Sequence, residues 1–418
     1  MGVHSQEGVA VRSATWSAIA MLLVGLAACS LYDDDADPLA RSEGGVPPSA
    51  HGSPTNGTGA TPGGAADATG EPETYDDTDP APAGPCPCPR GDCTASDDMP
   101  CDSGEGLCGE GMCHPTGTLE SLPVPHEGFW PTAVSLSADG SLLAITAERA
   151  EDGPDGDRQA SVVPLDGGDP RVEPDAIAAV FHPVDAAVWA VALGEAVEVR
   201  DLGGGVLHRV EGAGPPMAFS PDGARLAATV AAGVRVVSLD AAADEVLLDH
   251  PQDRDARLWL LAFSPEGTRV ATGRGASGFG SPVGDVRVFD AHSGERLHLF
   301  DCPAASGGFN ADASLLAVAC WNYTALYDLS SGTATVLPAP MLAQGARFLT
   351  PHDGEPRLLL GSFLGLVRVL RHRDGEWVIE SAVEFPAVRD VVELPDGALL
   401  LAPWSDLTVH RWTPSSRL

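Results

Sequence analysis

The chain has 418 residues and a formal net charge of −35, from 59 acidic and 24 basic side chains. Every basic residue is an arginine, which excludes catalysis by a lysine amine. The acidity disfavours nucleic-acid binding, because that affinity comes mainly from basic side chains that neutralise phosphates.

The first 28 residues have the pattern of an export signal. The apolar stretch Trp16–Ala28 follows Arg12 and spans 13 residues, too few to cross a bilayer and typical of a signal peptide. It ends in Leu26-Ala27-Ala28-Cys29, which resembles a bacterial lipobox. Residues 1–28 are therefore predicted to be a lipoprotein signal peptide and Cys29 the lipidated N-terminus. The alternative is an ordinary signal peptide with an incidental cysteine.

Lipidation would anchor the protein in the bacterial cell envelope, at the outer membrane and on its periplasmic or surface side. Two or more acyl chains anchor durably, since each buried CH₂ contributes roughly 0.8 kcal/mol.

Residues 29–85 are rich in Pro, Gly, Ala, Thr and Asp and contain almost no large apolar side chains. Such a segment cannot bury enough surface to offset the entropy lost on ordering, so a disordered acidic tether is predicted. Its reach would be on the order of 40 Å, enough to hold a folded domain away from a lipid surface.

A cysteine-rich module is predicted over residues 86–117. Six cysteines within 28 residues, downstream of an export signal, favour three disulfides, and fifteen connectivities are possible. Zinc binding is the competing interpretation. The stretch DDMPCDSGEGLCGEGMC resembles small modules of exported myxobacterial proteins. The six cysteines are Cys86, Cys88, Cys93, Cys101, Cys108 and Cys113.

The remainder of the chain repeats one pattern seven times. The copies begin at residues 136, 181, 219, 263, 309, 348 and 393, and Phe263–Gly273 (FSPEGTRVATG) is the clearest. In each, an apolar strand ends in a turn-forming cluster and a second strand follows at once. Val286–Asp290 and Arg296–Phe300 then alternate with period 2, so each repeat holds four strands. A period of roughly 40–45 residues is typical of a propeller blade.

The run from Phe263 to Phe300 resembles a WD-repeat blade, with Phe289-Asp290 where that family often has Trp-Asp. The resemblance covers about residues 118–413, without the family's Gly-His pair. It implies an all-β fold, a seven-bladed β-propeller over residues 118–418. It also implies that the lone strand Thr118–Val124 supplies the missing outer strand of blade seven.

Two further cysteines, Cys302 and Cys320, fall in the fifth repeat. With the WD-repeat strand order, Cys302 would enter the inner strand of blade five and Cys320 would end its second strand, on the same face. They are predicted to form a disulfide, with two buried free thiols as the alternative.

The sequence contains no clear catalytic constellation. There is no Gly-rich phosphate loop, no nucleophile elbow and no HExxH motif, and the twelve histidines are scattered. We therefore expect no catalytic residue, no cofactor and no metal. The acidic loop 148–157 is the best candidate for Ca²⁺, although a solvated loop is the better interpretation.

One face of the propeller is predicted to bind a partner. The connections Glu148–Arg158 and Arg274–Gly284 are long, and with the WD-repeat order they share a face with the links between blades. Aromatic residues on loops over a rigid scaffold are typical of binding sites, although packing between blades is the alternative. The candidate binding residues on this face are Trp130, Phe279, Trp321, Tyr323 and Trp404.

Together these features predict a lipid-anchored, non-enzymatic scaffold for protein–protein interaction in the cell envelope. We expect it to be a monomer that binds envelope proteins, attaches to the membrane through its lipid and binds no nucleic acid. The alternative is a lactonase- or quinoprotein-like propeller enzyme with its active site at the central channel. Such an enzyme should bring carboxylates and histidines from the inner strands together, and these strands mostly lack them.

Overall fold

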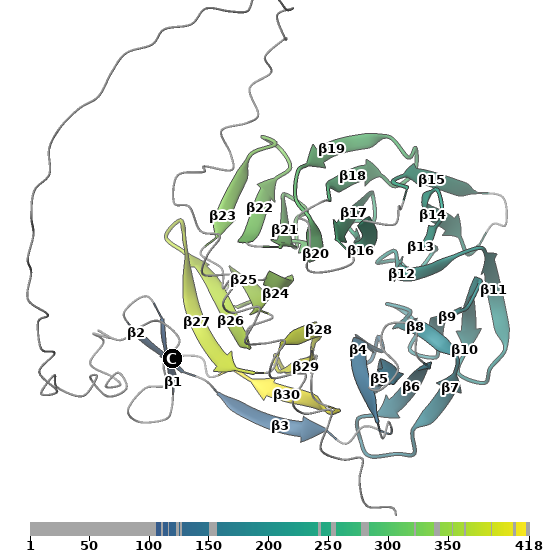
Figure 1. The fold of residues 1–418 in the computed structure, drawn as a ribbon, viewed down its shortest axis with the longest axis horizontal. Coiled ribbons are helices and arrows are strands. Elements are labelled where there is room, and N and C mark those ends of the chain that lie inside the picture. Colours follow the sequence, from purple (N-terminus) through teal and green to yellow (C-terminus); the bar gives the residue numbers. More distant parts are fainter. Residues whose placement is uncertain are drawn as a thin grey trace, which may run out of the picture. The chain divides into compact units, whose positions relative to one another are not determined.

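Figure 1 shows the computed structural model, a closed ring of antiparallel sheets. Residues 1–105 lie outside the part of the chain that is described, and with them the predicted signal peptide, Cys29, the tether and Cys86, Cys88, Cys93 and Cys101. Among the described residues, no helix is long and apolar enough to cross a membrane. The described residues are 106–109, 112–115, 117–122, 125, 128–149, 157–240, 244–251, 256–276, 284–321, 323–337, 343–352, 354–362, 365–385, 387–403 and 407–414.

Seven four-stranded sheets form the blades, and within each blade the strands run outward from the ring axis (Figure 1). Blade one contains β4 (Phe129–Leu136), β5 (Leu142–Arg149), β6 (Arg158–Pro164) and β7 (Arg171–Pro174). Blade two contains β8 (Ala176–Phe181), β9 (Val188–Leu193), β10 (Ala196–Asp201) and β11 (Val206–Glu211). Blade three contains β12 (Gly214–Phe219), β13 (Arg225–Val230), β14 (Gly233–Ser238) and β15 (Glu245–Asp249).

Blades four to six have the same order. Blade four contains β16 (Ala256–Phe263), β17 (Arg269–Ala276), β18 (Val286–Asp290) and β19 (Arg296–Phe300). Blade five contains β20 (Ala304–Phe309), β21 (Leu315–Cys320), β22 (Tyr323–Asp328) and β23 (Ala334–Leu337). Blade six contains β24 (Ala343–His352), β25 (Glu355–Ser362), β26 (Leu366–Arg373) and β27 (Glu376–Glu384).

Blade seven closes the ring with a strand from the other end of the repeat region. It contains β28 (Val388–Glu393), β29 (Leu399–Pro403), β30 (Val409–Thr413) and, outermost, β3 (Thr118–Leu122). Leu119 lies opposite Trp412 in this antiparallel pair. The all-β fold, the seven blades and the closing strand are confirmed. The described strand covers Thr118–Leu122, and the last two residues of the predicted strand, Pro123 and Val124, lie outside the described residues.

The turn between the first two strands of a blade explains the repeated sequence. In blade three the Ser220 hydroxyl donates to Asp222 and accepts the Arg225 amide, at 2.5 and 2.9 Å. Gly223 has φ +74°, a left-handed conformation that glycine adopts without strain. In blade one the corresponding Asp139 accepts the Ser141 amide, and these hydrogen bonds lower its pKa to about 2.

The same turns connect neighbouring blades. Arg225 of blade three donates to the Gly267 and Ala291 carbonyls of blade four, at 2.6 and 3.3 Å. Arg269 of blade four donates to the Ala313 carbonyl of blade five at 3.2 Å. The arginine that follows the turn therefore ties each of these blades to the next.

The core is divided among the spaces between the blades. An apolar cluster lies between each pair of neighbouring blades. The largest fully buried side chains, Trp189 and Trp412, belong to two of these clusters. Each sheet therefore buries both faces, which is why the strands near the axis have apolar residues in succession rather than in alternation.

A small hairpin precedes the propeller. β1 (Gly106–Gly109) pairs with β2 (Met112–Pro115), and Cys108 lies opposite Cys113 in the ladder. The hairpin packs against β27, the outer strand of blade six (Figure 1).

Cys302 and Cys320 are joined by a disulfide in blade five, with their Cα atoms 5.6 Å apart. Cys302 lies in the link that enters β20 and Cys320 is the last residue of β21, and both are fully buried. The bond therefore ties the entry of the inner strand to the end of the second strand.

Candidate functional site

The two faces of the ring differ in their connections. One face, here called the loop face, holds the links between blades and the connections between second and third strands. On this side every inner strand has a register shift, a β-bulge, near its first residues. A bulge re-aims the side chain of its extra residue. The extra residues, here called the bulge ring, are Thr132, Ile177, Pro215 with Pro216, Trp259, Ala305, Gln344 and Arg389.

Trp259 is the most conspicuous member of the bulge ring. Its neighbours Leu258 and Leu260 are two residues apart yet pack into different cores, one against blade three and the other against blade five. The extra residue in β16 causes this reversal and leaves Trp259 outside both cores, with 51% of its surface exposed. An aromatic side chain so exposed on a rigid inner strand is suited to contact a ligand.

The residues next to Trp259 on this side, Gly275 and Ala304, are small. The Trp259 Nε1 atom donates to the Gly275 carbonyl at 3.3 Å. A Cβ atom at Gly275 would lie 2.5 Å from the Ala304 carbonyl oxygen and 3.2 Å from the Trp259 ring. Glycine is therefore required at position 275, and Ala304 lies two residues after the disulfide-bonded Cys302.

The three predicted aromatic residues that the structure describes do not form one cluster. Trp130 lies at the start of β4 in blade one, whereas Trp321 and Tyr323 lie at the β21–β22 turn of blade five, across the ring in Figure 1. Tyr323 is half-buried against the core of blade five, and burial raises its pKa. Phe279 and Trp404 lie outside the described residues.

A buried histidine organises the loop face of blade four. His250 has no exposed surface, and its ring nitrogens lie 2.6 Å from the Thr272 hydroxyl and 3.1 Å from Asp285. A carboxylate only accepts, so Nε2 carries the proton toward Asp285 and Nδ1 accepts from Thr272. Burial lowers the pKa of His250, and the nearby Arg287 and Arg274 lower it further against the effect of Asp285.

Asp285 is the centre of this network. Arg274 Nε and Arg287 Nε donate to it at 2.8 and 2.6 Å. Burial would raise the pKa of Asp285, but the hydrogen bonds from His250 and Arg287 outweigh it and hold the pKa well below its usual range. The carboxylate is therefore ionised and accepts hydrogen bonds from three side chains, which suits a structural role rather than that of a catalytic base.

The acidic connection of blade one is also held by arginines. Arg389 contacts Glu148 at 2.6 Å, Arg158 contacts it at 3.6 Å, and Arg149 contacts Asp157 at 3.4 Å. The ends of the connection proposed for Ca²⁺ are thus ion-paired, and residues 150–156 lie outside the described part. No group of three or more metal-ligating side chains occurs among the residues that the structure describes.

The inner strand of blade seven carries the carboxyl of Asp390. Asp390 of β28 accepts the Val134 amide of blade one at 2.9 Å and the Val391 amide at 2.8 Å. Burial raises its pKa, opposed by Arg347 and these two amides. Its oxygens fasten blade seven to blade one, which gives this carboxyl a structural role.

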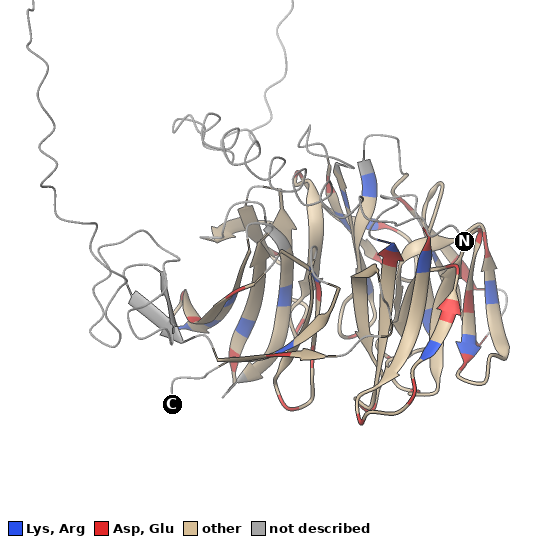
Figure 2. Ribbon diagram, turned by 60° about the horizontal axis from the view of Figure 1, so that its bottom comes forward, with Lys and Arg blue, Asp and Glu red and all other residues tan. Residues whose placement is uncertain are grey.

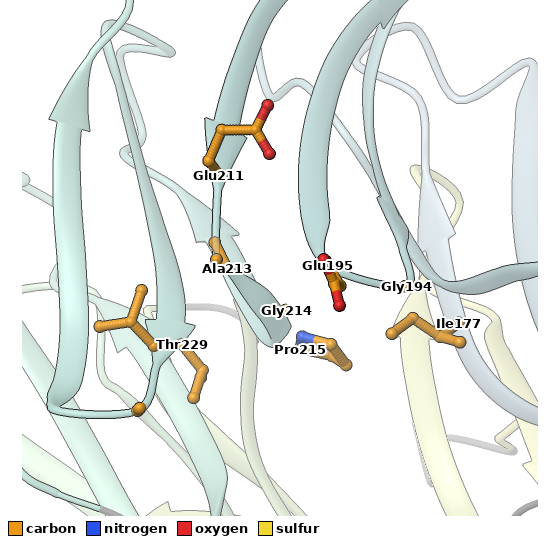
Figure 3. Close-up of a pocket in the computed structure, with 11 residues that line it drawn as sticks. Ile177, Gly194, Glu195, Glu211, Ala213, Gly214, Pro215 and Thr229 are labelled. Carbon is orange, nitrogen blue, oxygen red and sulfur yellow. The ribbon is translucent and has the colours of Figure 1, made fainter.

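A hollow of about 590 Å³ lies on the loop face, at the seam between blades two and three. Figure 3 shows the residues that line it. Ile177 and Pro215 of the bulge ring form its inner end, so the hollow adjoins that ring. The carboxylates of Glu195 and Glu211 both belong to blade two, one in the β9–β10 turn and the other at the end of β11. A second hollow of about 300 Å³ is lined by apolar residues, among them Ile145, between blades seven and one.

The described arginines do not gather into one basic surface. In Figure 2 they are interspersed with acidic segments along the strands. Several strand arginines pair with acids, as Arg357 does with Glu380 at 2.8 Å and Arg200 with Glu173 at 2.7 Å.

Comparison with solved structures shows a propeller fold. One similar chain is from hydrazine synthase of Kuenenia stuttgartiensis, with 16% identity and a TM-score of 0.54, covering 72% of this chain and 100% of that one. Another is from a crystal structure of a mitotic checkpoint complex, with 15% identity and a TM-score of 0.55, covering 82% of this chain and 99% of that one. At these identities the likeness concerns the fold alone. No protein-family model and no curated protein sequence matches the chain.

Sequence reasoning missed Trp259 and His250. The signal for Trp259 was a tryptophan inside an unbroken apolar run, Leu258–Ala262, where an inserted residue changes the alternation. For His250 the signal was a histidine just after the outer strand of blade three, at the link to the next blade.

Proposed function

We propose that this protein is a non-enzymatic scaffold that binds a partner protein on the loop face, around the bulge ring. The observation that carries the proposal is the half-exposed Trp259 on a rigid inner strand. Truncating a tryptophan at the centre of an interface typically costs about 2–4 kcal/mol of binding free energy.

The charged groups of the loop face favour binding over catalysis. Asp285, Glu148 and Asp390 are each engaged by arginines or backbone amides. Acid–base catalysis needs a group that can exchange a proton with a substrate, and these contacts occupy the carboxylates that come closest to that role.

The proposed location is the bacterial cell envelope, with attachment through a lipid on Cys29. The lipobox-like sequence before Cys29 supports this proposal. The disulfide between Cys302 and Cys320 also supports it, because disulfides persist in oxidising compartments outside the cytosol.

Site-specific photo-crosslinking in cells tests the function. p-Benzoylphenylalanine placed at Trp259 should yield a crosslinked adduct with one partner protein. The matched control places it at Leu297 of the same blade, which is 42% exposed on the outer strand β19. Equal adducts at both positions, or none at 259, would contradict binding at the bulge ring.

A further inference from the structure

The hollow between blades two and three has the features of a specific subsite. We propose that it receives an arginine side chain of the partner, beside the contact with Trp259. This inference rests on the proposed function, because it assumes a protein ligand on the loop face. It adds the chemistry by which that ligand is recognised.

The floor of the hollow suits the stem of a long basic side chain. Ala213 and Val230 are buried there, and Ile177 and Pro215 are half-buried. Arginine packs its methylene groups and the flat faces of its guanidinium on such apolar surface while its nitrogens stay at a polar rim.

The rim supplies the opposite charge. Glu195 ends the turn between β9 and β10, Glu211 ends β11, and both side chains are exposed. Glu211 already accepts a hydrogen bond from Arg209 Nε at 2.7 Å, but the two oxygens of a carboxylate have about four lone-pair sites, so it can accept from a second guanidinium. The Gly212 amide donates to the Glu195 carbonyl at 2.7 Å, which holds the end of β11 beside the β9–β10 turn. A guanidinium has five donors and forms charge-assisted hydrogen bonds with carboxylates. Two carboxylates are too few to hold Ca²⁺, which takes six to eight oxygen ligands.

Three glycines leave the hollow open. A Cβ atom added at Gly194, Gly212 or Gly214 would meet no other atom within 4 Å. The first two have φ of +54° and +66° and so favour glycine for conformational reasons. Gly214 has no such requirement, because its φ lies outside the left-handed region. A side chain at position 214 would therefore enter the hollow without backbone strain.

The charge of the whole chain favours the same ligand. With a net charge of −35 and no lysine, the protein attracts cationic segments over long range, and the hollow would select among them by contact.

Isoleucine methyl NMR tests the proposal on the full chain. The chain has four isoleucines, and Ile177 lines this hollow, whereas Ile145 lines the apolar hollow at the blade seven–one seam and Ile379 lies on β27. The probe is the peptide acetyl-Gly-Gly-Arg-Gly-Gly-amide. The control probe carries citrulline, the neutral isostere, in place of arginine.

We expect the arginine peptide to shift the Ile177 methyl signal in a saturable way and to leave Ile145 and Ile379 in place. The citrulline peptide should bind about tenfold more weakly or not at all. Glu195→Gln with Glu211→Gln should weaken binding to the same degree, and Gly214→Leu should abolish it with both carboxylates retained.

A matched pair keeps the test specific. Glu266→Gln with Glu295→Gln removes two equally charged, exposed side chains from the turns of blade four and should leave the Ile177 titration unchanged. An equal loss of peptide affinity in this control pair would show that binding depends only on the net charge of the protein, and it would overturn the proposal. Equal binding of the citrulline peptide, or no Ile177 shift, would also overturn it. If a partner crosslinks at Trp259 but the arginine peptide does not shift Ile177, the arginine subsite is ruled out and the proposed scaffold function still stands.

Discussion

Replacing Asp285 by Asn should destabilise the propeller far more than the loss of an ordinary surface charge. The carboxylate lies between Arg274, Arg287 and His250. The side chains of Asp285, Arg274 and Arg287 are only 14%, 18% and 16% exposed, and that of His250 is fully buried. Asparagine keeps one acceptor oxygen but removes the charge, which leaves two guanidinium groups facing each other across a neutral amide.

Removing one partner of a buried ion pair costs about 3–5 kcal/mol. Because each side chain here keeps some contact with solvent, we expect a smaller loss, about 2–3 kcal/mol in the free energy of unfolding. The matched control is Asp396→Asn, since Asp396 pairs with Arg411 at the surface with side chains 55% and 35% exposed. That substitution should cost less than about 1 kcal/mol.

Urea unfolding at pH 7, followed by tryptophan fluorescence, measures both losses. If Asp285→Asn and Asp396→Asn shift the unfolding midpoint equally, the network around Asp285 contributes no more than a surface ion pair. Asp285 would then have no special structural role.

The pH dependence of stability gives a second measurement of this network. The folded-state pKa of His250 is lowered, so its contribution to stability is present above the unfolded value of about 6.5 and is lost as the pH falls below it. The pKa of Asp285 is also lowered, so its contribution persists to below about pH 4. His250→Gln should therefore flatten the stability profile between pH 7 and 5 by at most about 1.4 kcal/mol per pH unit. An unchanged slope would contradict a buried neutral histidine.

Three further predictions follow from the closing strand, the disulfide and the N-terminus. A chain that begins at Pro125 lacks β3 and should lose several kcal/mol of stability or aggregate through the open edge of β30; an unchanged thermal melting curve would contradict this. Replacing Cys302 and Cys320 together by Ala should cost about 3 kcal/mol in urea unfolding, as expected for a sequence separation of 18, and a reductant should then have no additional effect. Cys29→Ala should move the protein from the detergent phase to the aqueous phase in partitioning experiments, and retention in detergent would rule out a lipid at this residue.

The sequence by itself determined the architecture of the ring. Each blade is a meander of neighbouring strands, so its information is local: an apolar strand, a Ser-Pro-Asp-Gly turn and a second strand, as in Phe219–Val230. The need for a fourth strand in blade seven followed from the same regularity. Thr118–Leu122 belongs to the lone strand that precedes the first repeat, and it fills this position.

Only the tertiary structure decided the candidate site. Trp259 is exposed because a bulge in β16 sets Leu258 and Leu260 on opposite faces, and a bulge exists only once β17 has chosen its register. His250, in the link after β15, and Asp285, just before β18, are 35 residues apart, and they meet only when blades three and four pack together. The hollow beside Ile177 depends on the spacing of two blades whose facing residues are remote in sequence. A repeat pattern specifies which residues turn inward, whereas the shape of the surface depends on how closely neighbouring sheets approach, and that distance is a property of the packed ring.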